Sequence, residues 1–171
     1  MKTRNLTRTA VLIALLVAVQ YVTKAAGQLV TGSCVNLILA VSAALCPLPW
    51  ALVVALISPF FAFLLGIGTP LIQIVPAIAV GNAVYVMLLH WLGKRFVFRG
   101  GKAAAVIVAA VVKFLTLWGA VVGLLLPMMA LPEPKTAALT ASFTWPQLIT
   151  ALVGGAVSLL VIPTLKKTIK S

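Results

Sequence analysis

Residues 103–126 read AAAVIVAAVVKFLTLWGAVVGLLL, and this run decides the fold. The only charged residue of this run is Lys113. The length of the run exceeds the roughly 20 apolar residues that a helix needs to cross a bilayer. A helix satisfies all the backbone hydrogen bonds of such a run within the run itself. The run therefore predicts a transmembrane helix.

The composition extends this prediction to the whole chain. Of the 171 residues, 63% are hydrophobic and 8% are charged, whereas a soluble domain has about 25% charged residues. So few polar side chains do not cover a water-facing surface, but a lipid-facing surface needs no such cover. We expect an all-α membrane protein of one domain, a bundle of about six transmembrane helices.

Five further apolar runs flank the deciding one. The six predicted spans are 6–28, 35–46, 50–66, 70–92, 103–126 and 145–165. The fourth has Thr69 as its expected N-cap and Pro70 at its first position. The second and third are short, so a single re-entrant pair is the alternative. A polar loop over 128–143, a candidate lid, precedes the sixth span.

Thirteen Lys and Arg stand against one acid, and they lie between the apolar runs. With six spans, ten of them fall on one side: Lys2, Arg4, Arg8, Lys94, Arg95, Arg99, Lys102, Lys166, Lys167 and Lys170. Lys24 and Lys135 fall on the other side. The positive-inside rule then predicts that both termini are cytoplasmic. This pattern indicates a lipid bilayer as the partner and no nucleic acid. The alternative for residues 1–26 is a signal peptide.

Enzymatic constellations are missing from the sequence. Glu133 is the only acid, which excludes paired-carboxylate chemistry. His90 has no second metal ligand near it, and Cys34 and Cys46 match no zinc motif. No phosphate-binding Gly-x-x-x-x-Gly-Lys-[Ser/Thr] loop is present. We expect no enzyme, no metal and no cofactor.

Polar residues at membrane depth mark the first candidate site. Lys113 lies near the middle of its span, where a lysine is costly unless it is paired or hydrated. Asn82 is at matching depth in the preceding span, and Tyr85 shares its face. Trp118 follows Lys113 and is a candidate for stacking on a flat ring. These residues predict a substrate pocket; structural roles for Lys113 and Asn82 in helix packing are the alternative.

Two more groups of residues are candidates. Asn36 flanks the first outer turn and Trp145 ends the last outer loop, so both are expected at the pocket mouth. An interfacial aromatic belt is the alternative for Trp145. Ala10, Ala14 and Ala18 are four residues apart, which places them on one helix face where another helix can approach closely.

Several phrases of the sequence resemble a known family. They are Thr7-Arg-Thr-Ala10 leading into the alanine series, Val35-Asn-Leu37, Ser58-Pro59, Leu65-Gly-Ile-Gly68 and Pro76-Ala-Ile-Ala-Val-Gly-Asn82. With the size and the six-span layout, they resemble the substrate-binding S component of an energy-coupling factor (ECF) vitamin transporter. Within that family they are similar to the riboflavin and pantothenate-type group.

The resemblance implies a mechanism and partners. An S component binds a vitamin-like molecule between outer loops and helices four to six, in the plasma membrane of a prokaryotic-type cell. It docks on a transmembrane T component driven by two ATPase subunits. The resemblance places docking on Ala10, Ala14 and Ala18, and part of the pocket on the loop from Gly27 to Asn36. It leaves open pantothenate, nicotinate and a flavin.

Two other classes of function stay open at this point. A self-contained secondary transporter or channel usually needs an acid at membrane depth for its coupling ion, and the spans contain none. A ligand-free structural membrane subunit predicts that Lys113 is satisfied inside the protein.

Overall fold

The computed structural model of the protein describes residues 2–96 and 100–170. Within these ranges every regular element is a helix and none is a strand. The prediction of an all-α fold is therefore confirmed. Arg99, which the sequence placed among the cytoplasmic charges, lies outside the described residues.

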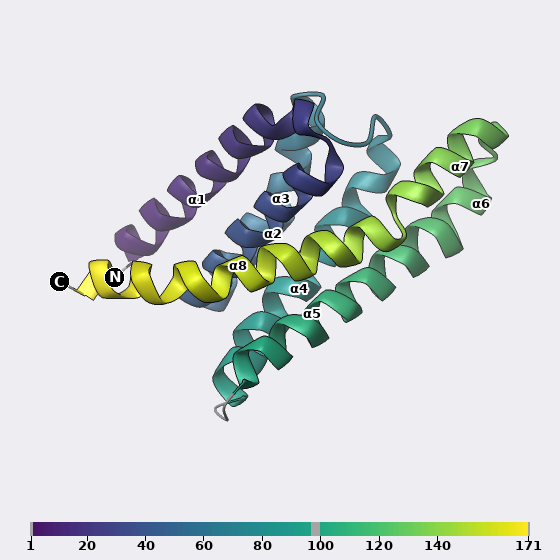
Figure 1. Ribbon diagram of the computed structural model, residues 1–171. Coiled ribbons are helices and arrows are strands. Elements are labelled where there is room, and N and C mark those ends of the chain that lie inside the picture. The colour runs from purple at the N-terminus through teal and green to yellow at the C-terminus, as the bar shows by residue number, and fades with distance from the viewer. Residues whose placement is uncertain (1, 97–99, 171) are drawn as a thin grey trace.

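The first half of the chain forms four helices (Figure 1). They are α1 (Lys2–Thr23), α2 (Gln28–Leu45), α3 (Leu48–Leu64) and α4 (Val75–Arg95), with short 3₁₀ turns η1 (Lys24–Ala26) and η2 (Ile72–Ile74). The second half forms one long composite helix followed by two more. These elements are α5 (Gly101–Leu117), the π-helical η3 (Trp118–Leu125), α6 (Leu126–Met129), α7 (Glu133–Ser142) and α8 (Trp145–Lys170).

Five helical segments are long and apolar enough to cross a membrane, judged by length and composition. They are Thr3–Ala26, Gln28–Leu45, Ile72–Arg95, Gly101–Met129 and Glu133–Thr168. The remaining apolar helix, α3, is shorter, with 17 residues. Large apolar side chains point outward, among them Leu64 at 76% and Leu160 at 77% exposure. The chain is thus a multi-pass membrane bundle whose outer surface suits lipid.

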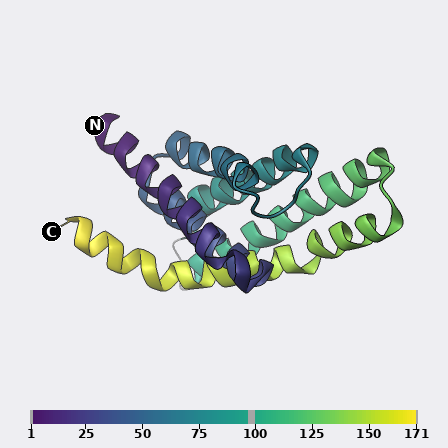
Figure 2. The same ribbon diagram turned by 90° about the horizontal axis from the view of Figure 1, so that it is seen from above.

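Consecutive long helices run in opposite directions, so the bundle has two distinct ends. Both chain termini lie at one end, far from α6 and α7, in two perpendicular views (Figures 1 and 2). This end, called the basic end here, holds most of the described basic side chains: Arg4, Arg8, Lys94, Arg95, Lys102, Lys166 and Lys167. Lys24 and Lys135 lie at the opposite end, called the open end. Seven of the ten basic residues predicted on one side are thus described at the basic end, and the side of the membrane that this end faces stays a prediction.

Three predicted boundaries are wrong. The second helix begins at Gln28 rather than at Val35. Its first turns pack closely on α8, because a Cβ on Gly154 would meet the Ser33 carbonyl and one on Gly32 would meet Thr150. Residues 28–34 have propensities that favour a turn, and this contact with α8 stabilises them as a helix instead.

The other two boundary errors concern prolines. The fourth helix begins at Val75, with Pro76 in its first turn, and Thr69 is not its N-cap. The fifth span continues past Pro127 to Met129. Pro127 lies in the first turn of α6, two residues after the end of the π-helical η3, where the backbone hydrogen-bond pattern already changes. The loop expected over 128–143 contains α7, with Pro132 and Pro134 at its start.

The core lies along α2, which packs against α1, α4 and most extensively α8. Small residues bring these helices close together. A Cβ on Gly155 would meet the Val106 side chain, and one on Gly81 would meet Leu117. Close contact through glycine is typical of membrane helix interfaces. The tight packing closes the bundle below the open end.

Candidate functional site

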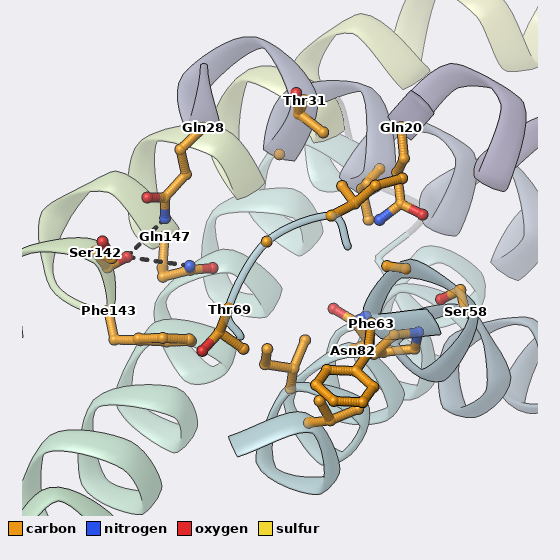
Figure 3. Close-up of a pocket in the computed structure, with 18 of the residues that line it drawn as sticks. Gln20, Gln28, Thr31, Ser58, Phe63, Thr69, Asn82, Ser142, Phe143 and Gln147 are labelled. Carbon is orange, nitrogen blue, oxygen red and sulfur yellow. Dashed lines mark hydrogen bonds between the residues drawn. The ribbon is translucent and has the colours of Figure 1, made fainter. Parts of the chain in front are cut away.

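A cavity of about 450 Å³ lies at the open end of the bundle (Figure 3). It is lined by the end of α1, the start of α2, the end of α3, the start of α4, Lys113 on α5 and the α7–α8 junction. The segment 67–70 closes another side. Seven parts of the chain therefore contribute to one concave site.

Lys113 forms the polar floor of this cavity. Its side chain is 2% exposed, and its Nζ donates to Asn36 Oδ1 at 2.6 Å and to Asn82 Oδ1 at 2.7 Å. The same Nζ lies 5.2 Å from the centre of the Tyr85 ring, within the range of a cation–π contact. No ion pair of Lys113 occurs within the described ranges, where Glu133 is an exposed residue of α7. Two amide oxygens and a ring thus replace water around a buried amine.

The ammonium group fixes the orientation of both amides. A lysine ammonium only donates hydrogen bonds, so each asparagine must turn its oxygen toward it and its NH₂ group away. The Asn36 NH₂ donates to the Gly32 carbonyl at 2.9 Å and to Thr150 Oγ1 at 3.3 Å. The Asn82 NH₂ group makes no hydrogen bond within the described part of the chain. Asn82 lines the cavity, so this donor is available to a ligand.

Lys113 also keeps donor capacity. An ammonium group has three N–H bonds, and the two amide oxygens use two of them. The floor therefore presents hydrogen-bond donors to the cavity and no acceptor from these groups. Such a floor is suited to a carboxylate, a phosphate or a carbonyl oxygen.

Gln20 and Ser58 form a second polar position on the α1–α3 side of the cavity. Gln20 Oε1 and Ser58 Oγ are buried and lack hydrogen-bond partners among the described residues, although both residues line the cavity. Both side chains lie toward the same side of the pocket in Figure 3. A buried polar atom without a partner costs about 1–3 kcal/mol, and a bound molecule or water offsets that cost.

The rim of the cavity is tied together at one carbonyl. The Ser142 carbonyl accepts from Gln28 Nε2 at 2.7 Å and from Gln147 Nε2 at 3.2 Å (Figure 3). These bonds join the start of α2 and the start of α8 to the end of α7. Phe143, next to this carbonyl, is buried and lines the cavity. The segment expected to act as a lid is thus ordered and covers part of the mouth.

The structure brings three of the predicted pocket residues together at the cavity. Asn36, Asn82 and Lys113 line it, and their mutual hydrogen bonds come from three helices. Tyr85 lies behind them, fully buried, and its hydroxyl donates to the Ala151 carbonyl at 2.9 Å. Tyr85 therefore supports Lys113 from behind and is not among the residues that line the cavity.

The two predicted tryptophans lie elsewhere. Trp118 is 46% exposed and Trp145 is 58% exposed, and neither lines the cavity. Trp118 follows Lys113 by five positions, which is about 140° around a helix, so it points away from the floor. Trp145 begins α8 on its outer side. Neither ring is placed to stack on a molecule in this cavity.

The three alanines lie on an exposed face of α1. Ala10, Ala14 and Ala18 are exposed, whereas Leu16 and Gln20 on the other side of the helix are buried. One face of α1 thus contributes Gln20 to the cavity, and the three exposed alanines lie on another face. The docking role predicted for the alanines stays a prediction.

Gln20, Ser58 and the rim glutamines were not predicted as site residues. Their signal in the sequence is a single polar residue inside or beside an apolar run, as in Ala18-Val-Gln-Tyr21. That signal does not state whether the side chain faces a neighbour, lipid or a cavity. Only the packing of α1 on α3 decides this.

The fold and the cavity together define a multi-pass helical membrane protein with a concave, partly polar cavity at one end. A family profile described as ECF transporter, substrate-specific component, matches residues 4–166. The chain therefore belongs to the family of substrate-specific components of ECF transporters. The resemblance described from the sequence is confirmed at this level, and the riboflavin/pantothenate-type group stays a prediction. Comparison with curated proteins and with solved structures gives no match.

Proposed function

We propose that the cavity at the open end binds one small vitamin-like molecule with high affinity for import. The observation that carries this proposal is the donor floor: Lys113 and Asn82 both line the cavity, and their mutual bonds leave N–H groups of each unused. A carboxylate, phosphate or ring carbonyl of the substrate accepts from these groups. In a cavity with little water, such charge-assisted bonds are stronger than on a surface.

The size of the cavity supports a small substrate. Its volume of about 450 Å³ lies in the lower part of the range of small-molecule sites, roughly 300–1,000 Å³. Pantothenate, nicotinate and a flavin combine an acceptor group with a suitable size. Cobalamin is far larger and is not favoured by this cavity.

We further propose that energy for transport comes from partner subunits. The sequence has no phosphate-binding loop for ATP, which suits a subunit that depends on a T component and two ATPases. The exposed faces of Ala10, Ala14 and Ala18 support docking on the T component through α1. The positive charge of the basic end supports a plasma-membrane protein of prokaryotic type with both termini in the cytoplasm.

Mass spectrometry of small molecules released from the purified, tagged protein tests the binding function. We expect a stoichiometric vitamin-like compound with a carboxylate, phosphate or ring carbonyl. Lys113→Met removes the cationic donor and should lower the bound amount by on the order of 10- to 100-fold. Lys135→Met is the matched control, because Lys135 is exposed on α7 and does not line the cavity.

A ligand-free structural subunit is the competing function, and one observation bears on it. Two of the three Lys113 donors are satisfied inside the protein, as that function requires. The third donor, the free Asn82 NH₂ and the partnerless Gln20 and Ser58 atoms favour a ligand instead. Normal substrate uptake by cells that carry Lys113→Met would favour the structural subunit. No bound compound from cells grown in rich medium would count against the binding function.

A further inference from the structure

A second cavity, of about 180 Å³, lies at the basic end between α2, α4, α5 and α8. It shares no lining residue with the cavity at the open end. Its walls differ in chemistry. Its lining includes basic side chains together with apolar ones, among them Ala44, Leu89, Val106 and Ile162. The cavity is therefore amphipathic.

Three lysines from three different helices line the basic side. Lys94 lies in the last turn of α4, Lys102 in the first turn of α5 and Lys166 near the end of α8. The only acid of the chain, Glu133, lies at the other end of the bundle, on α7. Like charges around one cavity repel one another, and no carboxylate side chain among the described residues lies at this end to balance them. The arrangement calls for an anion from outside the chain.

A histidine holds one of these lysines in place. His90 Nδ1 lies 2.8 Å from the Ala43 carbonyl, and its Nε2 lies 2.8 Å from Lys94 Nζ. A carbonyl only accepts and an ammonium only donates, so Nδ1 carries the proton and Nε2 accepts. Lys94 is thereby fixed one helical turn beyond His90. Two of its three N–H bonds stay available for an anion.

We propose that this cavity binds an anionic phospholipid, with the phosphate between Lys94, Lys102 and Lys166. One acyl chain lies along the apolar wall. Lipid is favoured over a free phosphate because the cavity joins an apolar wall to a cationic rim at the end of membrane-spanning helices. Basic pockets between such helices, at the level of the headgroups, recognise anionic lipids. The phosphate of the bound lipid offsets part of the positive charge of the three lysines, and the lipid occupies the space between α4, α5 and α8.

Native mass spectrometry of the full-length protein, titrated with phosphatidylglycerol or phosphatidylcholine, tests this proposal. We expect one tightly retained phosphatidylglycerol and at least about tenfold weaker retention of phosphatidylcholine, since each lysine near an anionic headgroup contributes roughly fivefold. Lys94→Gln, Lys102→Gln and Lys166→Gln together should abolish the preference. The matched control is Arg4→Gln, Arg95→Gln and Lys167→Gln, which removes the same charge at the same end without touching the cavity.

Two further measurements separate the lipid from other anions and from nonspecific attraction. Ala44→Phe fills the apolar side and leaves the lysines in place, so we expect it to weaken phosphatidylglycerol binding. Millimolar inorganic phosphate should not displace the lipid. Displacement by phosphate, equal effects of the two triple variants, or equal affinity for the two lipids would each overturn the proposal. Thermal unfolding of every variant in detergent shows that the comparison is between folded proteins.

Discussion

Lys113 on α5 donates a hydrogen bond to Asn36 on α2, with 2.6 Å between Nζ and Oδ1 and 77 positions between the two residues in sequence. The same nitrogen donates to Asn82 on α4. One side chain thus joins three helices and also forms the floor of the cavity. Because the same atoms serve packing and the proposed binding, tests of this site must measure both.

The two asparagines should behave differently when replaced. Asn82→Leu removes an acceptor of Lys113 and also the NH₂ group that faces the cavity, so we expect the larger loss of ligand, on the order of tenfold or more. Asn36→Leu removes an acceptor and the α2–α8 bond to Thr150, so its main effect should be on stability.

Thermal unfolding in detergent, together with quantification of the bound compound, distinguishes the two variants. Asn5→Leu is a control far from the cavity, near the start of α1. Equal effects of Asn36→Leu and Asn82→Leu on both measurements would contradict the assignment of the free donor to Asn82.

Ser58→Ala tests whether a partnerless atom meets the ligand. The Ser58 hydroxyl has no partner in the described protein, so its removal should not lower the stability of the empty protein and could raise it by up to about 3 kcal/mol. Ligand affinity should fall roughly five- to tenfold if the substrate bonds to it. The control is Ser42→Ala, a buried serine bonded to the Leu39 carbonyl away from the cavity. Isothermal titration with the released compound measures the affinity of both variants, and thermal unfolding measures their stability. Unchanged affinity in Ser58→Ala assigns this position to water.

Gly154→Leu should damage the site through packing alone. A side chain at Gly154 meets the Ser33 carbonyl and Asn36, so it separates α8 from α2 and displaces an acceptor of Lys113. Overpacking of this kind costs about 1–3 kcal/mol, and we expect a lower melting temperature with loss of ligand. Gly119→Ala is the control, because a Cβ there meets no atom within 4 Å. A stable Gly154→Leu protein with normal binding would be incompatible with this geometry.

Ala14→Trp should separate binding from assembly. Ala14 is exposed on α1, opposite the face that carries Gln20, so the substitution should spare the cavity. If the alanine face docks on the T component, co-purification with that subunit should be lost. Leu160→Trp on α8, at a position that is 77% exposed, is the control for a bulky lipid-facing residue. Unimpaired assembly of Ala14→Trp would place the docking surface elsewhere.

The apolar runs and their charges predicted the helices because lipid imposes one strict rule on the backbone. Every polar backbone group in the hydrocarbon must bond within its own helix, so the length of an apolar run predicts a span. The depth of Lys113 and Asn82 followed from the same counting, and the two residues are in contact as expected. The depth of a residue in the membrane follows from its position along the span, so it can be counted from the sequence.

The direction of a side chain around its helix was harder to predict. Trp118 lies on the same continuous helical segment as Lys113 but faces outward, whereas Gln20, a single polar residue beside an apolar run, lines the cavity. The start of α2 depended on contact with α8 through Gly32 and Gly154, which are 122 positions apart by their numbers, 154 minus 32. Such contacts override local propensity, and a single sequence contains no measure of them.

The single carbonyl of Ser142 holds two glutamines that reach it from different helices, Gln28 and Gln147. Passage of a molecule between α7 and the starts of α2 and α8 would require both bonds to break. These bonds should therefore affect the rates at which a molecule enters and leaves the cavity more than its equilibrium affinity. Substitutions at Gln28 and Gln147 should therefore change the residence time of a bound molecule without altering the floor formed by Lys113.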